Sequence, residues 1–284
     1  MEGCVWPEVP CIRLTMASSQ RPIRIDEVNR HYKTPRRVAK ILRCLFWCIA
    51  GLSLLQIFPS VFPQQITTFI SITFVLLTLI FFSLSQAQRY YWLARAESER
   101  RRALLTDALG VPLSHEVTQL YYNNSYEPSL RRLGANLLEN SFFSSEVTKS
   151  MLGGCRLQSG LYLSLWIIFF ALRYSNYQLL IVVTQIVFSA EIIASWINLE
   201  ILHRRYESCF EKLKALFRLN DGLSGASSIA EILDVAIAYE SAKAAAGVLL
   251  DEDTFQKMNK SLTNRWNRMR LNLGIEVKSD ISNE

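Results

Sequence analysis

The chain has 284 residues, of which 50% are hydrophobic and 20% are charged, and its formal net charge is +6. With 11 glycines and 8 prolines, its composition excludes collagen-like and low-complexity proteins, which are much richer in these residues. The hydrophobic residues are gathered into a few long runs instead of being spread along the chain. Such clustering is typical of a membrane protein that also has soluble parts.

Four apolar runs are candidates for transmembrane helices, because about 20 apolar residues cross the hydrocarbon core of a bilayer. The runs are residues 44–62, 66–84, 157–172 and 179–199. Buried helices of a soluble protein are the alternative, but two close pairs of such runs are difficult to bury without lipid. We therefore expect an all-α membrane protein with four transmembrane helices in two hairpins, a helical cytosolic insert and a helical C-terminal domain.

Basic residues lie on one side of the four runs, and this asymmetry predicts their orientation. The two hairpin turns contain a single basic residue, Arg173, whereas the outer flanks of the runs are rich in Lys and Arg. Both termini and the middle segment are therefore expected in the cytoplasm. The predicted organisation is an N-terminal cytosolic segment (1–34), a first hairpin (35–84), a cytosolic insert (85–156), a second hairpin (157–199) and a cytosolic C-terminal domain (200–284).

The insert is expected to begin as a helix that continues out of the second run to Gly110, and Pro112 is expected to stop it. Residues 114–117 are expected to start a short helix. Ser145 is a candidate N-cap for another short helix, which Gly153 and Gly154 would break.

The C-terminal domain is expected to hold three helices. The first continues from the fourth run to about residue 219. Ser228 and Glu231 form a capping-box pattern that predicts a second helix to about residue 250. Asp251 predicts the start of a third helix, which ends near residue 272.

Catalytic and metal-binding motifs are absent from the sequence. There is no phosphate-binding loop, nucleotide-binding glycine fingerprint, zinc-protease motif or nucleophile elbow. The six cysteines have no Cys-x-x-Cys spacing, and the chain has only three histidines. We therefore expect neither an enzyme nor a cofactor or metal site. We expect no secretory signal, and Met16 is an alternative to Met1 as the initiator.

Glu191 lies near the middle of the fourth run, where an ionised side chain is costly unless it meets a partner or water. Gln185 and Ser195 lie on roughly the same side of the helix. The candidate partners on other spans are Gln56, Thr73 and Thr78. Two interpretations remain open: the polar stripe lines an oligomeric pore or pathway, or it joins spans by hydrogen bonds.

Two segments of the insert are candidate ligand-binding or regulatory surfaces. Arginines favour bidentate contacts with phosphate, and Asn side chains and aromatic faces suit a nucleobase. The candidates are Arg100, Arg101, Arg102, Tyr122, Asn123, Asn124, Asn136 and Asn140. A solvated helix face that signals topology explains the arginines equally, and turns and caps explain much of the rest.

The layout resembles that of the SMODS-associated four-transmembrane effectors, a family of pore-forming proteins in bacterial anti-phage defence. The residues that carry the resemblance are 96–110, 121–124, 136–143, 239–243 and 264–266. The resemblance implies an effector of the bacterial inner membrane that contacts membrane lipid and forms a homo-oligomer. Its trigger would be a cyclic oligonucleotide or a sensor protein from the same defence operon.

Two functions therefore compete. The first is an effector that permeabilises the membrane when its cytosolic region receives a signal. The second is a non-conducting membrane anchor or scaffold that recruits a cytosolic partner. Direct binding of nucleic acid is not expected, because the surplus positive charge lies beside the apolar runs and reports topology.

Overall fold

The computed structural model describes residues 25–56, 61–119, 121–122, 124–171, 179–219 and 225–275. Helices dominate these residues, which confirms the all-α part of the prediction. In chain order they are η1 (Glu27–Tyr32), α1 (Lys33–Leu55), α2 (Gln64–Ala87), η3 (Gln88–Leu93), α3 (Ala94–Leu109), α4 (Leu130–Ala171), α5 (Leu179–Arg218), α6 (Ala226–Ala246) and α7 (Glu252–Asn272).

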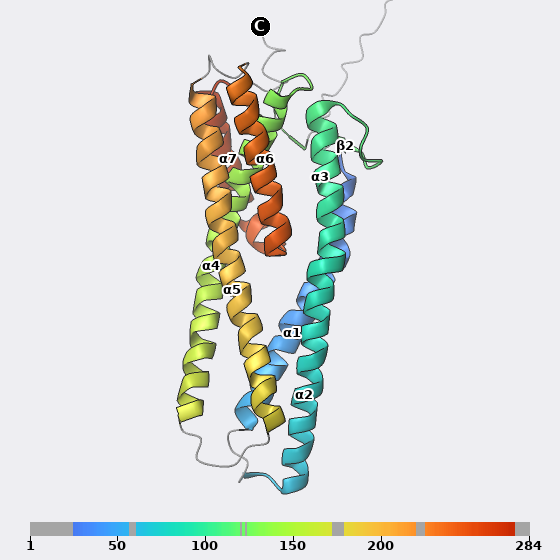
Figure 1. Ribbon diagram of the computed structural model, residues 1–284, viewed down its shortest axis with the longest axis vertical. Coiled ribbons are helices and arrows are strands. Elements are labelled where there is room, and N and C mark those ends of the chain that lie inside the picture. The colour runs from blue at the N-terminus through green and yellow to red at the C-terminus, as the bar shows by residue number, and fades with distance from the viewer. Residues whose placement is uncertain are drawn as a thin grey trace, which may run out of the picture.

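The described elements form two parts that run side by side along the long axis (Figure 1). The first part, which we call the arm, consists of η1, α1, α2, η3 and α3. The second part, which we call the bundle, consists of α4 to α7 (Figure 1). The short helices α6 and α7 pack against one end of the long helices α4 and α5, and the described helices at the other end are α1, α2, α4 and α5 (Figure 1).

Helices α2, η3 and α3 form one continuous helical rod, with a π-helical segment at η3. The rod ends where Gly110 adopts a left-handed conformation with φ of +70°, as its sequence predicts. The expectation that a short helix begins at residues 114–117 is wrong. The Thr106 hydroxyl oxygen accepts hydrogen bonds from the amides of Leu113 and Ser114, and the chain then enters strand β2 (Thr118–Gln119), which pairs antiparallel with β1 (Ile25–Asp26).

Helix α4 is a single helix of 42 residues, which corrects the expectation of a short helix that begins at Ser145 and breaks at Gly153 and Gly154. The Ser145 hydroxyl donates to the carbonyl of Phe142 in the preceding turn, so it does not act as a cap. The helix packs extensively against α5, and this packing outweighs the poor helix propensity of two glycines.

The C-terminal helices follow the prediction with two corrections. Helix α6 begins after Gly225, so Ser228 lies inside its first turns and is not the N-cap. It ends at Ala246, earlier than expected, because Gly247 adopts a left-handed conformation with φ of +57°. Asp251 is the N-cap of α7 as predicted, since its carboxylate accepts a hydrogen bond of 2.9 Å from the amide of Thr254.

Two hydrophobic clusters hold the structure together. The larger cluster fills the bundle and contains side chains such as Leu137, Leu213 and Trp266, and α3 contributes Leu104 and Ala108 to it. The smaller cluster lies between α1, α2 and α5, near the end of the molecule that lacks α6 and α7. Its fully or nearly buried members are Phe46, Ile49, Phe74, Phe81, Phe188 and Ile192.

Two helices of the described chain, Glu27–Leu55 and Gln64–Leu109, are long and apolar enough to cross a membrane. Only 17% of the residues in the apolar window of each helix are buried, and their exposed side chains include Trp47, Phe69 and Ile72. These helices contain the first two expected spans. Residues 157–171 and 179–199 are helical, and their crossing of a membrane stays a prediction.

Candidate functional site

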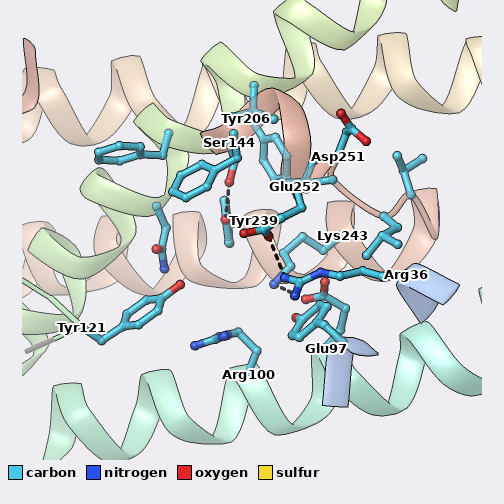
Figure 2. A pocket seen from close by; sticks show the side chains of 18 residues that line it. Arg36, Glu97, Arg100, Tyr121, Ser144, Tyr206, Tyr239, Lys243, Asp251 and Glu252 are labelled. Atoms are coloured by element: carbon cyan, nitrogen blue, oxygen red, sulfur yellow. Dashed lines mark hydrogen bonds and ion pairs between the residues drawn. The ribbon is translucent and has the colours of Figure 1, made fainter. Parts of the chain in front are cut away.

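A pocket of about 210 Å³ lies where the arm faces the bundle (Figure 2), and we call it the seam pocket. The arm contributes residues of η1, α1 and α3, whereas the bundle contributes residues of α4, α5, α6, α7 and the connection between α6 and α7. Segments far apart in the sequence therefore build one site. Its charged lining residues are Arg36, Glu97, Arg100, Lys243, Asp251 and Glu252.

Each cation of the seam pocket has a carboxylate partner. Arg36 of α1 donates to Glu252 at the start of α7 over 2.7 Å, and Lys243 of α6 forms an ion pair with Glu97 of α3. Both pairs join the arm to the bundle. Arg100 makes bidentate contacts of 2.9 and 3.0 Å with Asp26, which precedes η1 within the arm.

Lys243 has the most enclosed charge of these cations, with 12% of its side chain exposed. Burial by itself would lower the pKa of its amine. The carboxylates of Glu97 and Glu240 outweigh burial and raise this pKa well above its usual value. The amine therefore stays protonated and holds two carboxylates of different helices together.

Aromatic rings form the remaining walls of the pocket. The Arg100 guanidinium lies 4.6 Å from the centre of the Tyr121 ring, which is a cation–π contact. Tyr239 and Tyr206 lie with ring centres 5.0 Å apart, and Tyr239 shares a hydrogen bond of 3.1 Å with Ser144 (Figure 2). Burial raises the pKa of both Tyr206 and Tyr239, so the two phenols stay neutral.

This combination of groups suits binding more than catalysis. Guanidinium and ammonium groups bind anions, and tyrosine rings stack on flat or apolar groups. Because the cations already have carboxylate partners, an anionic ligand would have to replace one of these carboxylates. Within the described ranges, no group of His, Cys, Asp and Glu side chains is arranged to hold a metal ion.

The structure separates the three predicted arginines. Arg100 lines the seam pocket. Arg101 pairs with Glu240 of α6 over 2.9 Å, beside the pocket and across the seam. Arg102 pairs with Glu99 of its own helix and is 54% exposed, which is the solvated face that the alternative interpretation expected.

The predicted Asn and Tyr residues fall into two groups. Asn140 lines the seam pocket and donates to the hydroxyl of Tyr122 over 3.1 Å. Asn124 donates to Asn136 over 2.7 Å, and Asn136 donates to Asp107 over 2.8 Å. This second group is a buried structural network and does not line the seam pocket. Asn123 lies outside the described residues.

Glu191 lies in a second cavity, of about 490 Å³, which we call the vestibule. Its carboxylate accepts hydrogen bonds from Ser85 at 2.6 Å and from Gln86 at 3.4 Å. These partners differ from the three expected ones, which were Gln56, Thr73 and Thr78. Ser195 lines the same cavity.

The two remaining candidate polar residues of the apolar runs are Gln56 and Gln185. Gln56 is buried at the end of α1 and is not part of the vestibule lining. Gln185 belongs to α5, and its side chain is outside the described part of the structure.

Of the 18 residues that line the seam pocket, two, Arg100 and Asn140, are among the site residues predicted from the sequence. Arg36 was interpreted as a topology signal, and Tyr32, Glu97 and Glu252 had no predicted role. A usable signal existed only on α6, where Tyr239 and Lys243 are four residues apart and therefore share a face.

Comparisons with known proteins give no relative. No protein-family model, curated protein or solved structure matches the chain.

Proposed function

We propose that the chain is a membrane effector that permeabilises the bilayer when a signal binds its cytosolic region. In this proposal α1, α2 and the apolar ends of α4 and α5 form four transmembrane helices in two hairpins. The remaining helices lie in the cytoplasm, as the basic flanking residues predict.

The observation that carries the proposal is the position of the seam pocket. The pocket lies between the arm and the bundle, and both parts continue without interruption into the apolar end of the molecule (Figure 1). The rod Gln64–Leu109 links the pocket to the apolar end on one side, and α5 with 40 residues links it on the other. A ligand that changes the fit between arm and bundle would therefore change the packing of the apolar helices.

The chemistry of the pocket supports a small anionic ligand or an acidic segment of a partner protein. Such a ligand would compete with Glu252 for Arg36, or with Glu97 for Lys243. The Nε group of Arg36 is buried and has no hydrogen-bond partner among the described residues, so it supplies a further donor. The expected cyclic oligonucleotide has this chemistry.

A membrane-potential dye tests the proposal in bacterial cells that express the full chain. We expect depolarisation within minutes of induction, because an overexpressed effector populates its open state to a small extent even without the signal. A protein that inserts into the membrane and never depolarises the cells would contradict permeabilisation and would favour a non-conducting anchor.

Inorganic pyrophosphate serves as a probe of the seam pocket. It is expected to raise the melting temperature of the purified full chain in detergent. Arg36→Ala should abolish this rise, because it removes a guanidinium from the pocket. Arg37→Ala is the matched control, since Arg37 is exposed on the same helix and does not line the pocket. Equal responses of the two variants would place the anion elsewhere.

A further inference from the structure

The vestibule is surrounded by polar side chains from all four long helices. They include Arg43 of α1, Ser85 of α2, Gln158 of α4, and Glu191, Ser195 and Asn198 of α5. The connection between α6 and α7 closes the cavity on the side of the bundle, with Gly247 and Asp251 in its wall. A cavity of this size and polarity has room for several water molecules.

The charged residues of the vestibule comprise one ion pair, Arg43 with Asp251, and two groups, Arg89 and Glu191, whose partners are uncharged. Arg43 contacts Asp251 over 3.5 Å, and Arg89 donates over 2.7 Å to the carbonyl of Ala245 at the C-terminal end of α6. The hydrogen bonds that Glu191 accepts come from a hydroxyl and an amide, which carry no charge. These contacts bring no cationic side chain to its carboxyl group, which faces a polar cavity where a hydrated cation would fit.

An aromatic cluster closes the space next to the vestibule. Its central member is Phe188, which is 1% exposed and lies three residues before Glu191 on α5. The centre of the Phe188 ring is 5.5 Å from those of Phe46 and Phe81, and 5.4 Å from that of Tyr162. Rings at these distances are in contact, so water does not pass between them.

A second polar side chain lies further along α1. Gln56 follows Ile49 of the smaller hydrophobic cluster by seven residues, which is about 10 Å along a helix. It is 5% exposed, and neither its side-chain oxygen nor its nitrogen has a hydrogen-bond partner among the described residues. A buried amide of this kind is costly unless water reaches it. The order along the helices is thus a charged cavity, an aromatic constriction and a polar amide.

We propose that the vestibule is the cation-binding entrance of a permeation path through the interior of a single chain, and that Phe188 and its neighbours are the gate. This inference rests on the proposed function and adds to it the route and the sign of the permeating ion. Apolar constrictions close pores by excluding water, and acidic side chains at an entrance favour cations. The path lies between the four helices of one chain and does not require a second copy to complete it.

The gate is tested with the full chain in vesicles of phosphatidylethanolamine and phosphatidylglycerol. Phe188→Ala should increase K⁺ efflux at least tenfold without any ligand, because it removes the central ring. Phe69→Ala is the matched control on α2, since this ring is 71% exposed and makes no part of the cluster. Phe188→Leu keeps an apolar side chain and should stay closed, which separates the opening of a gate from misfolding.

The entrance is tested by ion selectivity in the Phe188→Ala background. Glu191→Gln should shift the reversal potential in a KCl gradient towards that of Cl⁻. Glu207→Gln should leave it unchanged, because Glu207 is an exposed residue of the same helix outside the vestibule.

Cys155 offers a measurement that needs no change at the gate. It lines the vestibule, and burial raises the pKa of its thiol. In a chain whose other cysteines are replaced, a positively charged methanethiosulfonate should label Cys155 several times faster than a negatively charged one. Glu191→Gln should remove this preference.

The outcomes separate the inference from the proposed function. A wild-type protein that depolarises cells, together with a Phe188→Ala variant that leaks no more than Phe69→Ala, would overturn the internal path and leave permeabilisation intact. Unchanged selectivity and labelling after Glu191→Gln would overturn the cation entrance. If neither the wild type nor Phe188→Ala conducts ions, both the internal path and the proposed permeabilisation are overturned.

Discussion

The arm is attached to the bundle in two places whose chemistry differs. Near the end of α3, Leu104 and Ala108 are buried in the core of the bundle. Asp107 accepts hydrogen bonds from Arg132 at 2.7 Å and from Asn136 at 2.8 Å in the same region. We call this region the apical attachment. It combines apolar burial with a satisfied polar network, which together favour a permanent contact.

The second attachment is the seam around the pocket, and it consists of charged pairs. Arg101 and Glu97 of α3 pair with Glu240 and Lys243 of α6, and Arg36 of α1 pairs with a residue of α7. The attraction within a buried ion pair is largely offset by the loss of hydration, so the net contribution of each pair to stability is small. The seam therefore specifies how the two parts fit, whereas the apical attachment holds them together.

The difference suggests how a ligand could act. A carboxylate of the seam can be exchanged for another anion at little net cost, because the cation keeps a partner. At the apical attachment, in contrast, a ligand that displaced a buried leucine would leave a cavity in the core. Movement is therefore expected at the seam, with the apical attachment as its pivot.

Lys243→Met is expected to have the largest effect on stability. It leaves the carboxylate of Glu97 enclosed without its cation, and loss of one partner of a buried pair costs about 3–5 kcal/mol. Chemical unfolding of the full chain in detergent measures this loss. The double variant Lys243→Met/Glu97→Met should recover most of it, since Glu240 keeps Arg101. A loss below about 1 kcal/mol in the single variant would show that the seam behaves like a surface ion pair.

Leu104→Ala is expected to weaken the apical attachment by about 2–5 kcal/mol, because Leu104 is 3% exposed and its removal leaves a cavity. The same unfolding experiment measures the change. Leu113→Ala is a suitable control, since Leu113 is 45% exposed and its loss should change stability by less than about 0.5 kcal/mol. Similar losses of stability in Leu104→Ala and Leu113→Ala would show that Leu104 behaves like a surface residue and does not attach the arm to the bundle.

The sequence predicted helices and their local signals better than it predicted contacts between distant segments. The cap at Asp251 and the stop at Gly110 depend on neighbouring residues, and the structure confirms both. Gly153 and Gly154 predicted a break that does not occur, because helix α4 is held by its packing on α5. Intrinsic propensity is a weak guide where tertiary packing opposes it.

The seam pocket shows the same limit for the candidate site. Arg100 and Asn140 were identified because their residue types suit an anion or a base. Arg36 was assigned to topology, since its neighbours in the sequence are also basic and lie next to an apolar run. Its partner is 216 positions away, and no local period connects Arg36 with Glu252. Such a pair becomes visible only when the arm is placed against the bundle.

Gly247→Ala is expected to cost about 1–2 kcal/mol, because a left-handed conformation is unfavourable for residues with a Cβ atom. A Cβ atom at this position would also clash with Cγ of Arg89, so the Arg89 side chain must move. The variant should therefore weaken the hydrogen bond between Arg89 and the end of α6, which increases amide hydrogen exchange there.

Gly154→Ala is the matched control for this substitution. Gly154 lies inside α4, and no atom lies within 4 Å of the position of a Cβ atom. This variant should gain about 0.5–1 kcal/mol, since alanine is the better helix former. A loss of stability in both variants would mean that backbone conformation is not the cause at Gly247.

Asp251→Ala is expected to have a smaller effect than Gly247→Ala, about 1 kcal/mol, through loss of the cap of α7. Partial burial would raise the pKa of Asp251, but hydrogen bonds from Thr254 and the guanidinium of Arg43 outweigh burial and lower it. A group with a lower pKa in the folded state stabilises the fold fully above its unfolded pKa, and this contribution disappears as the pH falls through the folded value. The difference between wild type and Asp251→Ala should therefore be constant at neutral pH and shrink below about pH 4.

Asp251→Asn separates the cap from the charge, because asparagine caps helices as well as aspartate does but does not titrate. At pH 7 it should keep most of the stability that alanine loses, and it should show no loss on acidification at this site. Asp251 lies at the junction of the seam pocket and the vestibule, since it belongs to the lining of both. If the asparagine variant also alters the response to pyrophosphate, the charge of Asp251 takes part in the coupling between the two cavities. An unchanged response would limit Asp251 to its role as a cap.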